Sequence, residues 1–174
     1  AYEISTRDWS SDVCSSDLAE FAFGPTGHNW CVGHARNAWN PAHITGGSSS
    51  GSATGVAARM FHAALGSDTG ASIRVPAHFC GVVGIKPTWG RVSRAGAMPL
   101  SWSLDTVGPL TRTVEDAALI LGLIAGTDPA DPTASAEPVP DYVAGLARGA
   151  KGLRIGVPTR FFTDRKSTRL NSSH

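Results

Sequence analysis

The sequence predicts an α/β fold, in which a sheet of short apolar strands is covered by helices. Two observations favour this class. Segments with apolar residues at helical spacing alternate along the chain with short apolar runs, and such alternation is typical of layered α/β proteins. The length of 174 residues fits one domain or part of one.

The first half of the predicted fold surrounds two glycine-rich turns. Residues 50–65 are rich in Ala and Ser and place apolar side chains at helical spacing, and the serines at 48–50 can cap such a helix. A short buried strand is expected at residues 64–67. A short helix at residues 72–79 and an apolar strand at 82–85 are expected to follow the second turn.

The second half contains the clearest local helix signal. Thr113 followed by Asp116 resembles a capping box, and Gly126 is expected to stop the helix that they open. The elements expected in this half are a long loop at 91–105, a strand at 106–110, a helix at 114–124, a Pro-rich linker at 127–140, a short helix at 142–147 and a strand at 153–157.

Both ends of the chain look foreign to the fold. Residues 8–18 read DWSSDVCSSDL and residues 164–174 read DRKSTRLNSSH, and both resemble conceptual translations of a sequencing-library adapter. We therefore expect a partial domain at residues 19–163, flanked by adapter-derived segments at 1–18 and 164–174.

Composition excludes several function classes. The 15 basic and 14 acidic side chains leave a net charge of +1, which provides no electrostatic footprint for direct nucleic-acid binding. No apolar run is long enough to cross a membrane. Outside the adapter-like ends the cysteines are Cys31 and Cys80, which suggests a reducing, cytoplasmic setting without a disulfide framework.

The two glycine turns carry the chemistry. Residues 46–53 read GGSSSGSA, and residues 66–74 read GSDTGASIR. Glycine allows close backbone approach and left-handed dihedral angles. A serine in such a turn can therefore present its hydroxyl beside a row of backbone N–H groups, which is the arrangement needed for acyl transfer through a serine ester.

These motifs, with the run GRVSRAGAMPLSWSLDTVGPLTRTVEDAALIL at residues 90–121, resemble the amidase signature family of serine hydrolases. The resemblance implies the family's fold, a mixed β-sheet covered by helices, here incomplete. It also implies cleavage of a carboxylic amide C–N bond without a cofactor or metal. The expected partners are a small-molecule amide substrate and, for the full-length parent, a second copy in a homodimer.

The resemblance also assigns roles to individual residues. Ser72 is expected to be the nucleophile, and Ser48, on a cis peptide bond, the serine that relays the proton to a lysine. The backbone N–H groups of Thr69, Gly70, Ala71 and Ser72 would stabilise the oxyanion. Support for the site is expected from Asp68, Arg74 and Ser49, with the Asp68 and Arg74 charges either orienting the turn or pairing with each other.

Two departures from the family pattern bear on activity. Ala71 replaces a glycine that usually precedes the nucleophile, and its methyl group restricts φ and narrows the floor of the pocket. The family's catalytic lysine lies upstream of the first glycine turn, but residues 19–47 contain no lysine. Lys86 and Lys151 match nothing catalytic. We therefore expect the chain to be inactive by itself.

Several alternatives compete with a free-standing amide hydrolase. Within the family, the chain could belong to the glutaminase component of a tRNA-dependent amidotransferase, and outside enzymes it could be an inactive fold remnant. The lead-in FAFGPTGHNW at residues 21–30 favours the hydrolase. The spacing of His28, His34 and His43 matches no common zinc pattern, and the first turn lacks the Gly-Lys-Ser/Thr ending of a phosphate-binding loop.

Overall fold

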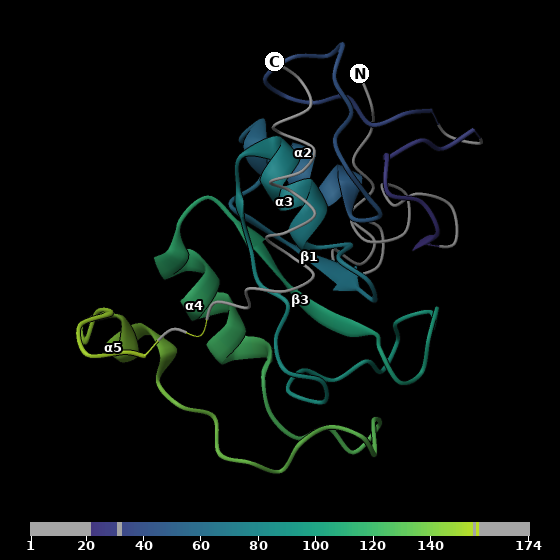
Figure 1. The fold of residues 1–174 in the computed structure, drawn as a ribbon. Helices are drawn as coiled ribbons and strands as arrows, with labels where there is room; N and C mark the ends of the chain where they lie inside the picture. Colours follow the sequence, from purple (N-terminus) through teal and green to yellow (C-terminus); the bar gives the residue numbers. More distant parts are fainter. Residues whose placement is uncertain (1–21, 31–32, 155, 157–174) are drawn as a thin grey trace.

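The computed structural model describes residues 22–30, 33–154 and 156. Its centre is a three-stranded sheet in the order β1-β3-β2, formed by β1 (Ala63–Asp68), β3 (Thr106–Thr111) and β2 (Val83–Gly84). Both neighbouring pairs are antiparallel, with Asp68 opposite Thr106 at one end of the ladder and Val83 opposite Thr111 at the other. The predicted α/β class is confirmed (Figure 1), although the described strands form no parallel pair.

Two short helices pack against one side of this sheet. These are α2 (Ser50–Ala57) and α3 (Arg74–Cys80), which also contact each other. Their small side chains allow close packing, because the core combines two alanines and a cysteine with Ile73 and Leu110, all at most 5 % exposed. The core therefore lies directly beneath the two glycine turns, which precede α2 and α3 in the sequence.

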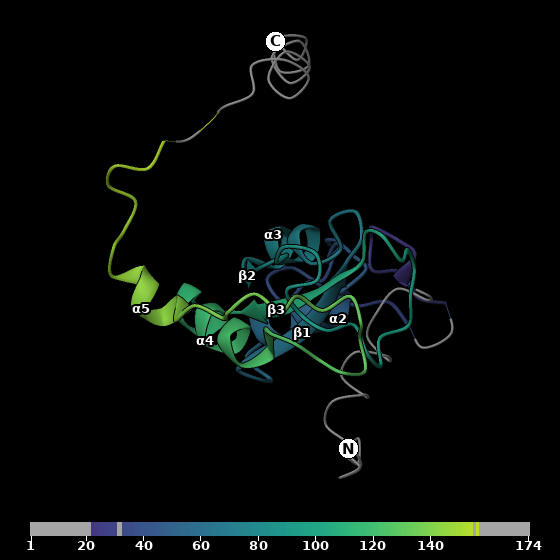
Figure 2. The ribbon, with the colours of Figure 1, turned by 90° about the horizontal axis from the view of Figure 1, so that it is seen from below.

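Helix α4 (Val114–Ile124) packs mainly against β3, on the other side of the strands from α3 (Figures 1 and 2). The capping prediction is confirmed, since the Thr113 hydroxyl accepts a hydrogen bond of 3.0 Å from the Asp116 backbone N–H. The short helix α5 (Tyr142–Leu146) contacts α4. None of the helices in the described part of the chain is long and apolar enough to cross a membrane.

The segment between α4 and α5 is held onto the long loop before β3. The Arg91 side chain donates hydrogen bonds to the hydroxyl of Tyr142 and to the carbonyls of Glu137 and Pro138. The backbone N–H of Ser135 bonds to the Gly90 carbonyl at 2.7 Å. The linker expected at 127–140 is thus ordered by arginine and backbone contacts, without a helix or strand of its own.

Two of the predicted elements are wrong in extent. The helix expected over residues 50–65 ends at Ala57, because Arg59 takes a left-handed φ of 63° and the Phe61 ring packs where a side chain on Gly55 would lie. That close approach turns the chain into β1. At the other end, Leu153 and Arg154 are not in a strand, and the rest of the strand expected at 153–157 falls largely outside the described residues. The adapter-like segments 1–18 and 164–174 also lie outside them.

Candidate active site

The first glycine turn places Ser48 in the interior. The peptide bond between Gly47 and Ser48 is cis, and Ser48 is completely buried. A side chain at Gly47 would collide with the carbonyl oxygen of Gly24, so the loop before the turn lies directly against it. No residue that the structure describes forms a hydrogen bond with Ser48 Oγ, which leaves a buried hydroxyl group without a partner from this part of the chain.

The second turn is built around a buried carboxylate. Asp68, at the end of β1, is completely buried, and its Oδ2 accepts hydrogen bonds from the backbone N–H groups of Ile73 at 3.1 Å and Arg74 at 3.4 Å. The Arg74 guanidinium adds two bonds of 3.0 Å, one to each carboxylate oxygen. Asp68 therefore closes the loop that carries Ser72, and the predicted pairing of Asp68 with Arg74 is confirmed.

The charge of this pair is set by its surroundings. Burial raises the pKa of Asp68, but the hydrogen bonds from the Arg74 side chain and from the Ile73 backbone outweigh it, so the pKa lies below the ordinary aspartate value. The hydrogen bond to Asp68 in turn raises the pKa of Arg74, whose side chain is 52 % exposed. The carboxylate is thus ionised at neutral pH and holds the turn as an acceptor.

Ser49 joins the two turns. Its backbone N–H donates to the carbonyl of Ser72 at 3.1 Å, and its hydroxyl bonds to the backbone N–H and carbonyl of Ser67 on β1. Ser48 and Ser72 therefore lie in neighbouring segments held by direct contacts. The two hydroxyls do not hydrogen-bond to each other, because Ser48 Oγ has no partner among the described residues.

The residues just before Ser72 leave several backbone donors available. Within the described chain, the N–H groups of Gly70, Ala71 and Ser72 donate no hydrogen bond. Ala71 has a φ of 137°, in the region that favours glycine. A side chain at Gly70 would meet no atom within 4 Å, so the turn faces open space.

The other candidate side chains lie apart from these turns. Lys86 Nζ donates to the carbonyl of Pro87 at 2.8 Å rather than to a serine. The His28 and His34 rings stack at 4.7 Å, and the described residues contain no group of three potential metal ligands. Burial raises the pKa of the Cys80 thiol, although a hydrogen bond from Thr54 opposes the change.

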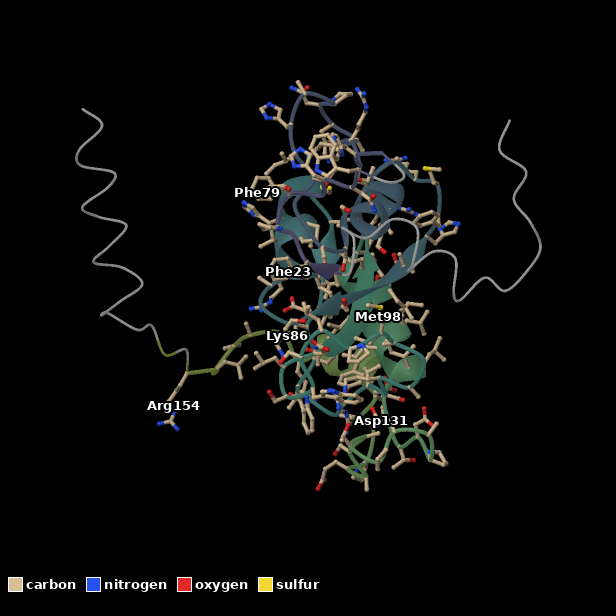
Figure 3. All side chains as sticks on the ribbon, turned by 90° about the vertical axis from the view of Figure 1, so that its right-hand side faces the viewer. Phe23, Phe79, Lys86, Met98, Asp131 and Arg154 are labelled. Atoms are coloured by element: carbon tan, nitrogen blue, oxygen red, sulfur yellow. The ribbon has the colours of Figure 1, made fainter. Side chains whose placement is uncertain are left out.

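A cavity of about 410 Å³ adjoins the second turn. Its lining includes Ser67 and Asp105 on the turn side, and Met98 and Asp131 on the loops (Figure 3). The Arg94 guanidinium lies over the Trp89 and Trp102 rings, at 4.9 and 6.0 Å from their centroids. Sequence reasoning did not single out Asp105. Its position as an acid immediately before a strand was the available signal.

The comparisons with known proteins agree with this geometry. The sequence model of the family described as Amidase matches residues 12–172. The chain belongs to the amidase family. It is 57 % identical over 145 residues to the A-type component of the Glutamyl-tRNA(Gln) amidotransferase of Trichlorobacter lovleyi, covering 83 % of this chain and 30 % of that protein.

Solved structures show the same family relationship. The structure of the corresponding Glutamyl-tRNA(Gln) amidotransferase component from Thermotoga maritima superposes with a TM-score of 0.69 at 48 % identity, over 70 % of this chain and 27 % of that one. The native peptide amidase from Stenotrophomonas maltophilia gives a TM-score of 0.69 at 45 % identity, over 74 % and 28 %. The chain spans about 30 % of the length of the curated relatives that it matches, and its fold is a partial amidase fold.

Proposed function

We propose that this chain carries the nucleophile and the proton relay of an enzyme that cleaves a carboxylic amide C–N bond. The observation that supports it most directly is the meeting of the two glycine turns. They bring a buried, unpartnered Ser48 hydroxyl next to the segment of a half-buried Ser72, whose preceding N–H groups have no partner in the described chain.

In the proposed reaction, Ser72 Oγ attacks the amide carbonyl carbon while its proton passes through the Ser48 hydroxyl to a basic group. The carbonyl oxygen becomes an oxyanion held by the N–H groups of Thr69, Gly70, Ala71 and Ser72. When the C–N bond breaks, the same relay returns a proton to the leaving nitrogen. Water then hydrolyses the acyl-Ser72 ester, which releases the carboxylic acid and frees the hydroxyl.

The basic group is proposed to be a lysine that the parent protein supplies from outside this chain. Residues 19–47 contain no lysine, and Lys86 is bound to the carbonyl of Pro87. The orphaned Ser48 hydroxyl supports this assignment, because a buried hydroxyl without a partner is costly and calls for a donor or acceptor. We therefore expect the chain alone to lack amidase activity.

The curated relatives favour a different ranking within the family from the one based on the lead-in sequence. Proteins 54–57 % identical to this chain are named as the A-type component of a Glutamyl-tRNA(Gln) amidotransferase. We therefore propose that the parent is such a component, which releases ammonia from an amide donor for use by a partner. A free-standing hydrolase is the second candidate, supported by the peptide amidase at 45 % identity.

Ammonia release by the full-length parent tests both candidates. The parent is assayed with glutamine and with simple aliphatic amides, with and without the product of a neighbouring partner gene. Glutamine cleavage stimulated by the partner supports the amidotransferase, and partner-independent cleavage of other amides supports the hydrolase. Loss of either activity in Ser72→Ala is expected, and its retention would overturn the proposed chemistry.

A further inference from the structure

Asp105 connects the nucleophile turn to the wall of the neighbouring cavity. It is 8 % exposed, and its Oδ1 accepts a hydrogen bond from the hydroxyl of Thr69, the first residue of the proposed oxyanion turn. Its Oδ2 accepts hydrogen bonds of 2.8 Å from the backbone N–H groups of Leu100 and Ser101. A single carboxylate thus binds both segments.

The same end of the sheet contains a second, parallel link. The buried Thr106 hydroxyl donates to the carbonyl of Asp68 at 2.9 Å. Asp68 and Thr106 are also opposite each other in the ladder between β1 and β3. The sheet end therefore fixes Asp105 relative to Asp68, so the Thr69 hydroxyl meets an acceptor whose position is already determined.

The other side of Asp105 shapes the cavity. Leu100, Met98 and Trp102 line it, and the loop that carries them turns tightly, because the Asp105 N–H bonds to the Ser101 carbonyl at 2.9 Å. Hydrogen bonds to an ionised carboxylate are about twice as strong as neutral ones. Asp105 therefore holds the cavity wall and Thr69 in one fixed arrangement.

We propose that Asp105 is a positioning residue for the amidase reaction: through the Thr69 hydroxyl it sets the backbone N–H groups of the oxyanion turn against the cavity that receives the substrate. This inference rests on the proposed function. Small displacements of a catalytic turn can lower kcat by up to about 100-fold. The link should therefore affect turnover, and not only folding.

The test uses the full-length parent carrying Thr69→Val, Asp105→Asn or both. Thr69→Val keeps the side-chain shape but removes the donor, and we expect kcat to fall by about tenfold or more while KM changes much less. Thr69→Ser, which keeps the hydroxyl, should lose less than Thr69→Val. The double variant should cost no more than Asp105→Asn alone, because both remove one contact.

Asp128→Asn is the matched control, since Asp128 also accepts from a hydroxyl, that of Ser93, and from a backbone N–H, that of Ala130. It should leave kcat unchanged. A fall in thermal midpoint without a fall in kcat for Thr69→Val, or additive losses in the double variant, would overturn the proposal.

Deuterium uptake separates this inference from the proposed function. If the parent proves inactive, or if Ser72→Ala keeps its activity, the proposed function fails. The Asp105 link is then decided by exchange in this chain. Faster uptake over residues 69–73 in Thr69→Val, but not in Asp128→Asn, supports the link, and equal uptake in both variants overturns it.

Discussion

Replacing Ala71 with glycine is expected to stabilise the chain, although glycine usually does the opposite. Ala71 has a φ of 137°, where an L side chain is rarely found, and its side chain is half-buried. Holding a residue other than glycine in such a region costs about 1–3 kcal/mol. The glycine variant should recover that strain.

Two opposing effects reduce the gain. Glycine gives the unfolded chain more freedom, which costs about 0.4–1 kcal/mol. Removing a half-buried methyl group costs about half of the ~0.8 kcal/mol assigned to a buried carbon. We therefore expect Ala71→Gly to raise the free energy of unfolding by about 1 kcal/mol.

The assay is urea unfolding followed by circular dichroism, with Ala136→Gly as the control. Ala136 is exposed and is not among the described residues with positive φ, so glycine there should lower the free energy of unfolding by about 0.4–1 kcal/mol. The two substitutions are chemically identical and should have opposite signs. If both destabilise the chain by similar amounts, the strain argument for Ala71 is wrong.

Three further perturbations test the supporting structure. Because the pKa of Asp68 is lowered on folding, its stabilisation is complete above the ordinary value of 3.8 and is lost as the pH falls below it. The penalty of Asp68→Asn in chemical unfolding should therefore shrink in acid, and a pH-independent penalty would contradict this. Gly47→Ala places a methyl group against the Gly24 carbonyl and should cost about 1–3 kcal/mol in the same assay, whereas a neutral effect would mean that the loop is not packed there. Thr113→Ala removes the cap of α4 and should cost about 1 kcal/mol, with Thr113→Ser losing less and no loss for alanine refuting the role of the cap.

The sequence predicted the parts of the fold that depend on neighbouring residues. Thr113 and Asp116 lie within one helical turn, and the bounds of α4 agree with the structure. The end of α2 depends instead on the Phe61 ring packing against Gly55, a tertiary contact that local helical spacing does not contain. The helix was therefore predicted too long.

The site divides in the same way. Asp68 and Arg74 are six residues apart, and their pairing could be anticipated from the turn that they flank. Thr69 and Asp105 are 36 residues apart, and only the antiparallel pairing of β1 with β3 brings them together. The roles of Ser48 and Ser72 remain predictions, because hydrogen bonds and burial show where a hydroxyl lies but not which one reacts.

Trapping the acyl-enzyme tests the central claim most directly. The full-length parent is mixed with a slowly hydrolysed amide or ester substrate, quenched in acid and analysed by peptide mass spectrometry. The account predicts an acyl adduct on Ser72 in the parent, none in Ser72→Ala, and none in this chain alone. An adduct on another residue, or turnover by this chain alone, would contradict it.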